Sequence, residues 1–263
     1  MKTTPVTYSS YLRLDELLAL QSPRSDGPEH DEMLFIVVHQ AYELWFKQML
    51  HELDRMQALL DGDDVVRVRH TLKRTLTILK VLVTQIDILE TMTPLEFLSF
   101  RDRLESGSGF QSFQFRALEC AMGGKRRPAV EHYPEDSAPR RFLEQRYTRT
   151  TIWDSFLHFL ARNGYDVPRA DLERDVTQPI VASPPLQALL LRIYRSDAGA
   201  REICERLVDL DEGVQEWRYR HVKMVQRTIG AKMGTGGSAG AEYLVTTLMK
   251  PAFPDLWEIR SEL

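Results

Sequence analysis

The chain has few of the residues that build disulfide frameworks and thiolate metal sites. Its 263 residues include two cysteines, Cys120 and Cys204, which lie far apart and in no Cys-x-x-Cys pair. The sequence therefore predicts neither a disulfide framework nor a metal site made of thiolates. We expect a protein of a reducing compartment, the cytoplasm.

Long apolar runs and blocks of one charge sign are also missing. The apolar stretches around Phe35 and Ile78 are soon interrupted by charged residues, and no apolar run precedes a small-residue cleavage site at the N-terminus. We therefore expect neither secretion nor a membrane span. The 38 acidic and 34 basic residues give a net charge of -4 and are spread along the chain, which argues against nucleic acid and membrane surfaces as partners.

Histidine pairs that would bind a metal on one helical face are absent. The chain has seven histidines but no Glu-x-x-His, His-x-His or His-x-x-x-His, which counts against a zincin site and against a carboxylate-bridged di-iron site. A cofactor that needs a single protein ligand is compatible with this pattern. Haem is the leading example, because one neutral imidazole can hold its iron.

Strand patterns are missing as well, and the fold class that we predict is all-α. No segment between hairpin turns shows a convincing alternation of apolar and polar residues, and no repeat has a solenoid period. The length allows one large domain or two modest ones, and we expect one helical domain over 1–263, a long-helix bundle with 1–24 as an N-terminal arm. Helical periodicity covers about 29–60, 65–92, 94–104, 110–122, 141–163, 185–194 and 200–229.

Capping signals mark several of these boundaries. Asp26-Gly27-Pro28-Glu29 offers an N-cap carboxylate, a proline in the first turn and a glutamate three residues on, and Thr93-Pro94-Leu95-Glu96 repeats that logic. Gly164 is suited to a left-handed C-cap at the end of 141–163. We expect 141–163 to be one helix at the periphery of the fold.

Two histidines lie on apolar helical faces. His39 shares its face with Phe35, Tyr42 and Phe46. His221 continues an apolar stripe at Leu207, Leu210, Val214, Trp217 and Met224. Each histidine is either a ligand or a core histidine with a backbone or side-chain partner, and spacing does not decide between the two.

Two further features suit a small amino acid as a ligand. Phe97 and Arg101 are four residues apart, so an aromatic wall stands beside a guanidinium that can grip a carboxylate; the alternative is a surface arginine paired with Glu105 or Asp102. The segment 230–244 holds five glycines whose loop could close over a polar ligand, but it lacks the phosphate-loop pattern and is otherwise a linker or a capping turn.

Four blocks, in order and near both ends of the chain, resemble the tryptophan 2,3-dioxygenase family. No generic helical bundle would combine them by chance. They are TYSSYLRLDELL, DEMLFIVVHQAYELWFKQ, TMTPLEFLSFRDRLESGSGFQSFQFR and EWRYRHVKMVQRTIGAKMGTGGSAGAEYL.

The resemblance implies a helical haem protein with one haem b per chain. His221 matches the proximal ligand of the haem iron, which leaves the opposite face open for dioxygen. His39 matches a distal histidine that hydrogen-bonds the indole nitrogen of the substrate, and Phe35 matches an aromatic wall of the indole pocket. We assign His39 an orienting role and leave open whether it acts as a base.

The resemblance also assigns the polar end of the substrate. Arg101 matches the arginine that pairs with the substrate carboxylate, and Thr235 matches a threonine that contacts the amino-acid end. Phe97 stands where some bacterial relatives have tyrosine, so a carboxylate hydrogen bond is expected to be missing. Tyr8 and Tyr11 match tyrosines that reach into the active site of a neighbouring subunit of a homotetramer.

The implied reaction is the addition of both atoms of dioxygen across the indole C2–C3 bond of L-tryptophan, which gives N-formylkynurenine and begins tryptophan catabolism by the kynurenine route. Two alternatives are a related haem indole oxygenase with a different substrate range and a non-catalytic helical oligomerisation module with structural histidines.

Overall fold

The structure is a computed structural model that describes residues 5–27, 29–235 and 240–263, and it contains no strand in those ranges. The prediction of an all-α fold is confirmed. The α-helices are α1 (Tyr8–Leu12), α2 (Leu14–Leu17), α3 (Asp31–Asp61), α4 (Val65–Leu89), α5 (Pro94–Phe100), α6 (Phe113–Ala121), α7 (Arg127–Glu131), α8 (Ala138–Thr148), α9 (Ile152–Arg162), α10 (Arg169–Leu172), α11 (Pro184–Ser196), α12 (Ala198–Ile229), α13 (Ala241–Val245) and α14 (Pro254–Glu258). Short 3-10 helices are η1 (Arg101–Leu104), η2 (Gly109–Gln111) and η3 (Ile259–Glu262).

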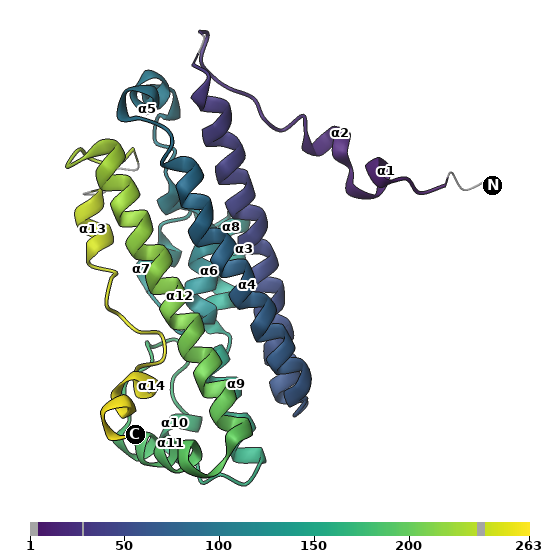
Figure 1. Ribbon diagram of the computed structural model, residues 1–263, viewed down its shortest axis with the longest axis vertical. Helices are drawn as coiled ribbons and strands as arrows, with labels where there is room; N and C mark the ends of the chain where they lie inside the picture. The colour runs from purple at the N-terminus through teal and green to yellow at the C-terminus, as the bar shows by residue number, and fades with distance from the viewer. Residues whose placement is uncertain (1–4, 28, 236–239) are drawn as a thin grey trace.

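The long helices α3, α4 and α12 lie side by side and form the frame of the molecule (Figure 1). Helix α4 packs along both α3 and α12, and each of the three helices buries the apolar stripe of its amphipathic pattern. Helices α6 and α9 pack on α3 from the other side. Among the described helices, none is long and apolar enough to cross a membrane.

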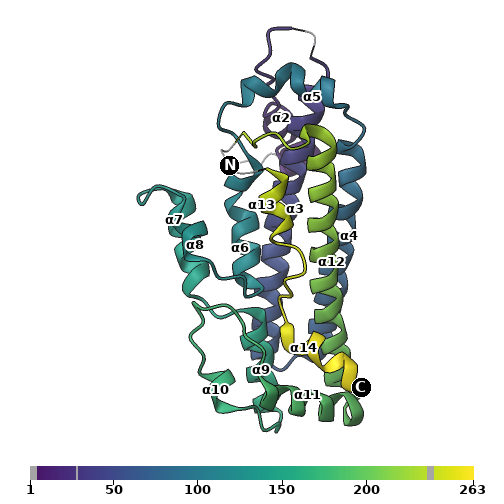
Figure 2. The ribbon, with the colours of Figure 1, turned by 90° about the vertical axis from the view of Figure 1, so that its left-hand side faces the viewer.

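One end of this frame is filled by large side chains. Trp153 and Phe156 of α9 are fully buried, and the indole of Trp153 stacks on Phe253 with ring centroids 5.6 Å apart. Helices α11 and α14 close the same end (Figure 2). The buried carboxylate of Asp211 on α12 accepts hydrogen bonds from the amides of Ala252 and Phe253 and from the indole of Trp257. This clamp fixes the C-terminal segment to α12.

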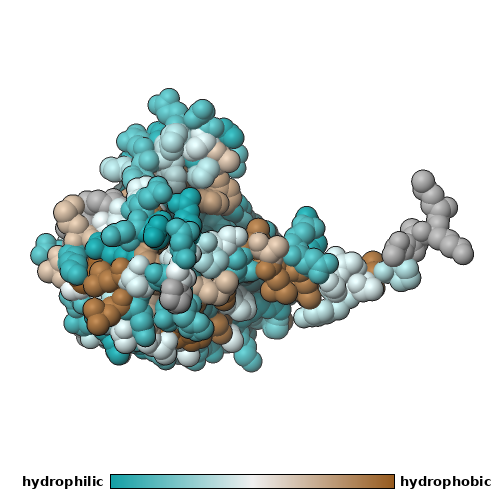
Figure 3. Space-filling view, turned by 90° about the horizontal axis from the view of Figure 1, so that it is seen from above, coloured by the Kyte–Doolittle hydropathy of each residue, from teal (hydrophilic) through white to brown (hydrophobic). Residues whose placement is uncertain are grey.

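The N-terminal arm projects away from the frame (Figures 1 and 3). None of the residues of α1 and α2 is buried. Leu18 and Leu20 are 71% and 63% exposed, and apolar side chains gather where the arm leaves the bundle (Figure 3). Such an arm has too little buried apolar surface to hold its shape alone.

The predicted start of the first long helix is corrected. The helix begins at Asp31, and its N-cap His30 makes no side-chain capping bond; Pro28 of the predicted motif lies outside the described residues. Glu32 in the first turn makes the local bonds instead. Its carboxylate accepts hydrogen bonds from the backbone amides of Arg24 and Ser25, at 2.7 and 3.0 Å. The chain entering the helix is therefore tied to the first turn.

The prediction for 141–163 was wrong in two respects. The segment forms two helices, α8 and α9, because Thr151 caps α9 in a capping box: its hydroxyl accepts the Asp154 amide, and the Asp154 carboxylate accepts the Thr151 amide at 2.6 Å. The second helix is also core and not periphery, as the burial of Trp153 shows. The left-handed C-cap at Gly164 is confirmed, with φ at 87°.

Candidate functional site

The end of the bundle away from Trp153 is hollow. A cavity of about 540 Å³ lies between α3, α5 and α12 and is closed by residues 107–112, by Gly234 and Thr235 after α12, and by the segment around α13. This volume falls within the range of roughly 300–1,000 Å³ that is usual for small-molecule sites. Six of the residues predicted from the sequence line it, and they come from α3, from the segment around α5 and from the end of α12 with the loop that follows: Phe35, His39, Phe97, Arg101, His221 and Thr235.

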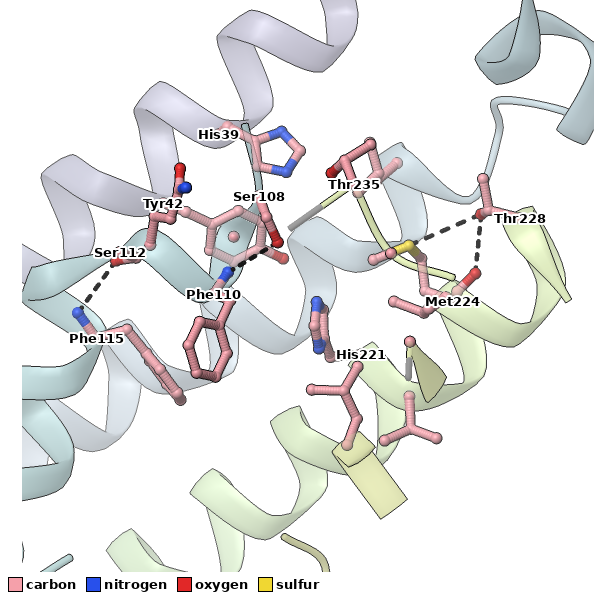
Figure 4. Close-up of a pocket in the computed structure, with 18 of the residues that line it drawn as sticks. His39, Tyr42, Ser108, Phe110, Ser112, Phe115, His221, Met224, Thr228 and Thr235 are labelled. Carbon is pink, nitrogen blue, oxygen red and sulfur yellow. Dashed lines mark hydrogen bonds between the residues drawn. The ribbon is translucent and has the colours of Figure 1, made fainter. Parts of the chain in front are cut away.

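His39 lies on the α3 wall of the cavity (Figure 4). Its surroundings determine whether the ring is charged and which nitrogen carries the proton. Burial lowers the pKa of His39, and this outweighs a backbone hydrogen bond that favours the charged form. The ring is therefore neutral near pH 7. Its Nδ1 lies 2.7 Å from the carbonyl oxygen of Phe35, and since a carbonyl only accepts, the proton sits on Nδ1. The remaining nitrogen, Nε2, is left as an acceptor.

His221 faces His39 from the opposite wall, on α12 (Figure 4). Burial lowers the pKa of His221 to about 4, helped by the neighbouring His39 and Arg116, so this imidazole is neutral too. Within the described part of the chain, neither of its ring nitrogens has a hydrogen-bond partner. A neutral imidazole without a partner on a cavity wall is the form that binds a metal.

Aromatic side chains form one side of the cavity near His39. The rings of Phe35 and His39 have centroids 4.0 Å apart, and Phe35 packs against Phe97 and Phe100 at 5.8 and 5.5 Å. Phe97 and Phe100 are buried, so helix α5 holds this wall from behind. The slot beside it suits a flat aromatic ligand.

Arg101 and Thr235 place polar groups at the rim. The guanidinium of Arg101 donates to the carbonyl of Met233 at 2.5 Å, and the hydroxyl of Thr235 donates to the carbonyl of Gly107 at 2.5 Å. The predicted alternative of a surface pair is wrong, because Arg101 makes neither of those bonds in the described chain and Glu105 pairs with Arg24. The two rim bonds join the loop after α5 to the loop after α12.

Tyr8 and Tyr11 are not part of this cavity within the chain. Both lie on α1 in the projecting arm, and they are 77% and 78% exposed. Within one chain, no packed core covers either ring among the described residues.

Sequence reasoning missed a buried ion cluster at the foot of the cavity. Glu119 on α6 accepts from three arginines at 2.6, 2.7 and 3.0 Å: Arg116, Arg126 and Arg218. Burial alone would raise the pKa of Glu119, but the three guanidinium groups outweigh it and lower the pKa. The spacing of Arg116 and Glu119 on one helix was visible in the sequence, but the contact with Arg218, 99 residues away, was not.

The arrangement limits what the cavity can bind. No group of three or more histidine, cysteine or acidic side chains able to hold a metal occurs in the described ranges. A metal at His221 would therefore have to arrive with most of its ligands, as in a flat metallo-macrocycle. The apolar walls, the single neutral imidazole and the cavity size fit such a group.

Comparisons with known proteins agree with this geometry. A family model described as tryptophan 2,3-dioxygenase matches residues 1–150 and 185–263. Proteins named tryptophan 2,3-dioxygenase from Herpetosiphon aurantiacus and Anaeromyxobacter dehalogenans are 58% and 54% identical over 98% of this chain and over 98% and 96% of their own lengths. One from Caulobacter vibrioides is 44% identical, with 98% of both chains covered. The chain therefore belongs to the tryptophan 2,3-dioxygenase family.

Proposed function

We propose that this protein is a haem-dependent dioxygenase that inserts both atoms of dioxygen across the indole C2–C3 bond of L-tryptophan. The product is N-formylkynurenine, and the reaction is the first step of tryptophan catabolism by the kynurenine route. The observation that carries the proposal is the pair of neutral histidines facing each other across an apolar cavity, in a chain of this family.

His221 would hold the haem iron, with one haem b per chain. The ring lines the cavity, is neutral because burial lowers its pKa to about 4, and has no partner in the described chain. When bound, haem supplies the iron chemistry that activates dioxygen. The protein contributes the ligand, the apolar walls and the anchors for the substrate.

His39 would orient the indole. Its Nδ1 proton is committed to the Phe35 carbonyl, so Nε2 can accept a hydrogen bond from the indole N–H. Phe35 and Phe97 would pack against the ring. Because His39 is already neutral, it enters this role without losing a proton.

Arg101 and Thr235 would fix the amino-acid end of tryptophan. Arg101 offers a fork of donors to the carboxylate, and Thr235 contributes a hydroxyl from the opposite loop. Both groups now bond to main-chain carbonyls across the rim, so substrate would replace bonds that close the cavity. Phe97 has no hydroxyl to add a further carboxylate contact.

The exposed tyrosines of the arm support a homotetramer with shared sites. Tyr8 and Tyr11 would enter the cavity of a neighbouring subunit, which would cover their exposed rings. A single domain over 1–263 and a cytoplasmic location stay predictions.

The test is reconstitution with haem b. Purified wild type, His221→Ala and His51→Ala, an exposed histidine of α3 outside the cavity, are compared for bound haem and for N-formylkynurenine formed from L-tryptophan in air. We expect stoichiometric haem and product in wild type and His51→Ala, and neither in His221→Ala. A wild type that binds no haem would overturn the proposal in favour of a structural helical module. Turnover that prefers indoles without the amino-acid end would favour an oxygenase of different substrate range.

A further inference from the structure

Trp217 lies one helical turn before His221 and covers one face of its ring. The two rings are almost parallel, at 4°, with centroids 5.1 Å apart. Residues four apart on a helix are neighbours, but parallel stacking of this kind requires that both side chains adopt matching rotamers. The indole thus restricts rotation of the imidazole towards it.

The indole itself is fixed by aromatic rings from other helices. Phe115 of α6 lies 4.8 Å from Trp217, while Phe46 and Tyr42 of α3 meet it edge-on at 6.1 and 6.3 Å. Phe46 and Tyr42 are buried. The orientation of the Trp217 side chain is therefore fixed by packing against three aromatic residues from two other helices.

The two cavity histidines differ in what orients them. His39 donates from Nδ1 to the carbonyl of Phe35, four residues earlier on its helix. His221 makes no such bond to Trp217 or to any other residue in the described ranges. A histidine that binds a metal usually donates its second nitrogen to a carbonyl or carboxylate, which fixes the ring and makes it more basic. What His221 has in place of such a bond is an indole stacked on the face of its ring.

Trp217 also borders two cavities. A second cavity of about 470 Å³ is lined by Met49, Leu79 and Ile180 among others, and Trp217 is one of several residues that line both. A smaller side chain would enlarge this open space and leave one face of His221 without support.

We propose that Trp217 is the positioning residue for the axial ligand: the face of its indole, and not a hydrogen bond, sets the rotation of the His221 ring. This inference rests on the proposed function, because it requires His221 to hold haem. A stacked ring does not polarise the imidazole N–H, so the ligand keeps the moderate basicity of a neutral imidazole.

The test compares side chains with and without an aromatic face. Trp217→Phe retains a face, Trp217→Met removes it while keeping much of the volume, and Trp45→Met makes the same exchange at a half-buried tryptophan of α3 outside both cavities. Measurements are the rate of haem transfer to apomyoglobin and the iron–histidine stretching band in the resonance Raman spectrum of the ferrous protein.

We expect Trp217→Met to lose haem roughly 10–100-fold faster than wild type and to shift or broaden the iron–histidine band, as for other residues that orient ligands. Trp217→Phe should lie between the two, and Trp45→Met should match wild type. Urea unfolding of the apoproteins serves as the control for stability. Trp217→Leu gives the same comparison should the methionine variant not fold.

Equal bands and equal haem loss in Trp217→Phe and Trp217→Met would overturn the inference, as would haem loss that follows apoprotein stability alone. His221→Ala is measured in parallel. If it keeps its haem, the proposed function fails; if it loses haem while Trp217→Met behaves as wild type, only the role of Trp217 fails.

Discussion

The two ends of the bundle use the same helices in opposite ways. At the closed end, α12 contributes Leu207 and Leu210, which are 1% and 0% exposed. At the hollow end, the same helix presents His221 to a cavity. Helix α3 shows the same division, with Leu53 and Met56 fully buried and Phe35 and His39 on the cavity wall. Stability is concentrated where side chains fill the space, and the chemistry where they leave it open.

The largest expected effect tests this division by deleting one large side chain from each end. Trp153→Ala should lower the free energy of unfolding by about 3–5 kcal/mol, because it empties a packed site. Phe35→Ala should cost clearly less, because Phe35 already borders open space. Urea unfolding of the two apoproteins measures both. Equal losses would show that the hollow end is as tightly packed as the closed one.

The next effect concerns the rim. Arg101→Met should raise the KM for L-tryptophan roughly 10–150-fold, since a hydrogen bond to a charged group contributes about 1.5–3 kcal/mol. The free energy of unfolding should change little, because the residue is partly exposed. Steady-state kinetics give the values, with tryptamine as the matched substrate that has no carboxylate. An equal rise for tryptamine would contradict a role in gripping the carboxylate.

The hollow end should also make the apoprotein sensitive to acid. Burial lowers the pKa of His221 to about 4, below its ordinary value of 6.5, so between these values the unfolded chain binds a proton that the folded chain does not. The free energy of unfolding therefore falls as the pH drops, by about 2 kcal/mol at pH 5 from this group. Burial lowers the pKa of His39 as well and adds in the same direction.

Urea unfolding of the apoprotein at pH 7 and pH 5 checks this dependence. His221→Gln should reduce the loss of stability on acidification, whereas His51→Gln, at an exposed position, should not. A His221→Gln apoprotein as sensitive to acid as wild type would mean that the buried charge lies elsewhere.

The smallest effect is expected at Thr235. Thr235→Val keeps the shape of the side chain but removes the hydroxyl that bonds Gly107 across the rim. In the proposed complex this hydroxyl bonds the amino-acid end of the substrate instead, and since one neutral hydrogen bond contributes about 0.5–1.5 kcal/mol, we expect a rise in KM of about 2–10-fold. Kinetics with the Arg101→Met, Thr235→Val double variant would show whether the two rim bonds act together, since coupled residues give non-additive changes.

Helix positions could be predicted because their causes are local. Apolar periodicity located α3, α4 and α12 within a few residues, and the Thr93 capping box with Glu96 began α5 where expected. The break at Thr151 was missed although the same kind of capping box stands there, because periodicity continues across it. The burial of α9 was missed because its partners, α3 and the C-terminal segment, are remote in sequence.

The site was predictable only in part, and for a similar reason. Resemblance to a family indicated His39, Arg101 and His221, and the structure brings them to one cavity. Periodicity placed Trp217 on the same stripe as His221, but stacking depends on rotamers that no spacing specifies. Of the three arginines around Glu119, Arg218 reaches it only once α12 has packed beside α6.

The clamp at Asp211 has an entropic consequence for the rim. It ties Ala252 and Phe253 to the middle of α12, while the same helix ends at Ile229, so the connecting segment, which includes α13, has both ends on one helix. The closure cost of such a loop grows only logarithmically with its length, by about 0.6 kcal/mol for each doubling. A change in the length of this segment would therefore cost little stability through chain closure, so its length is set by what Thr235 must reach at the rim and not by the stability of the bundle.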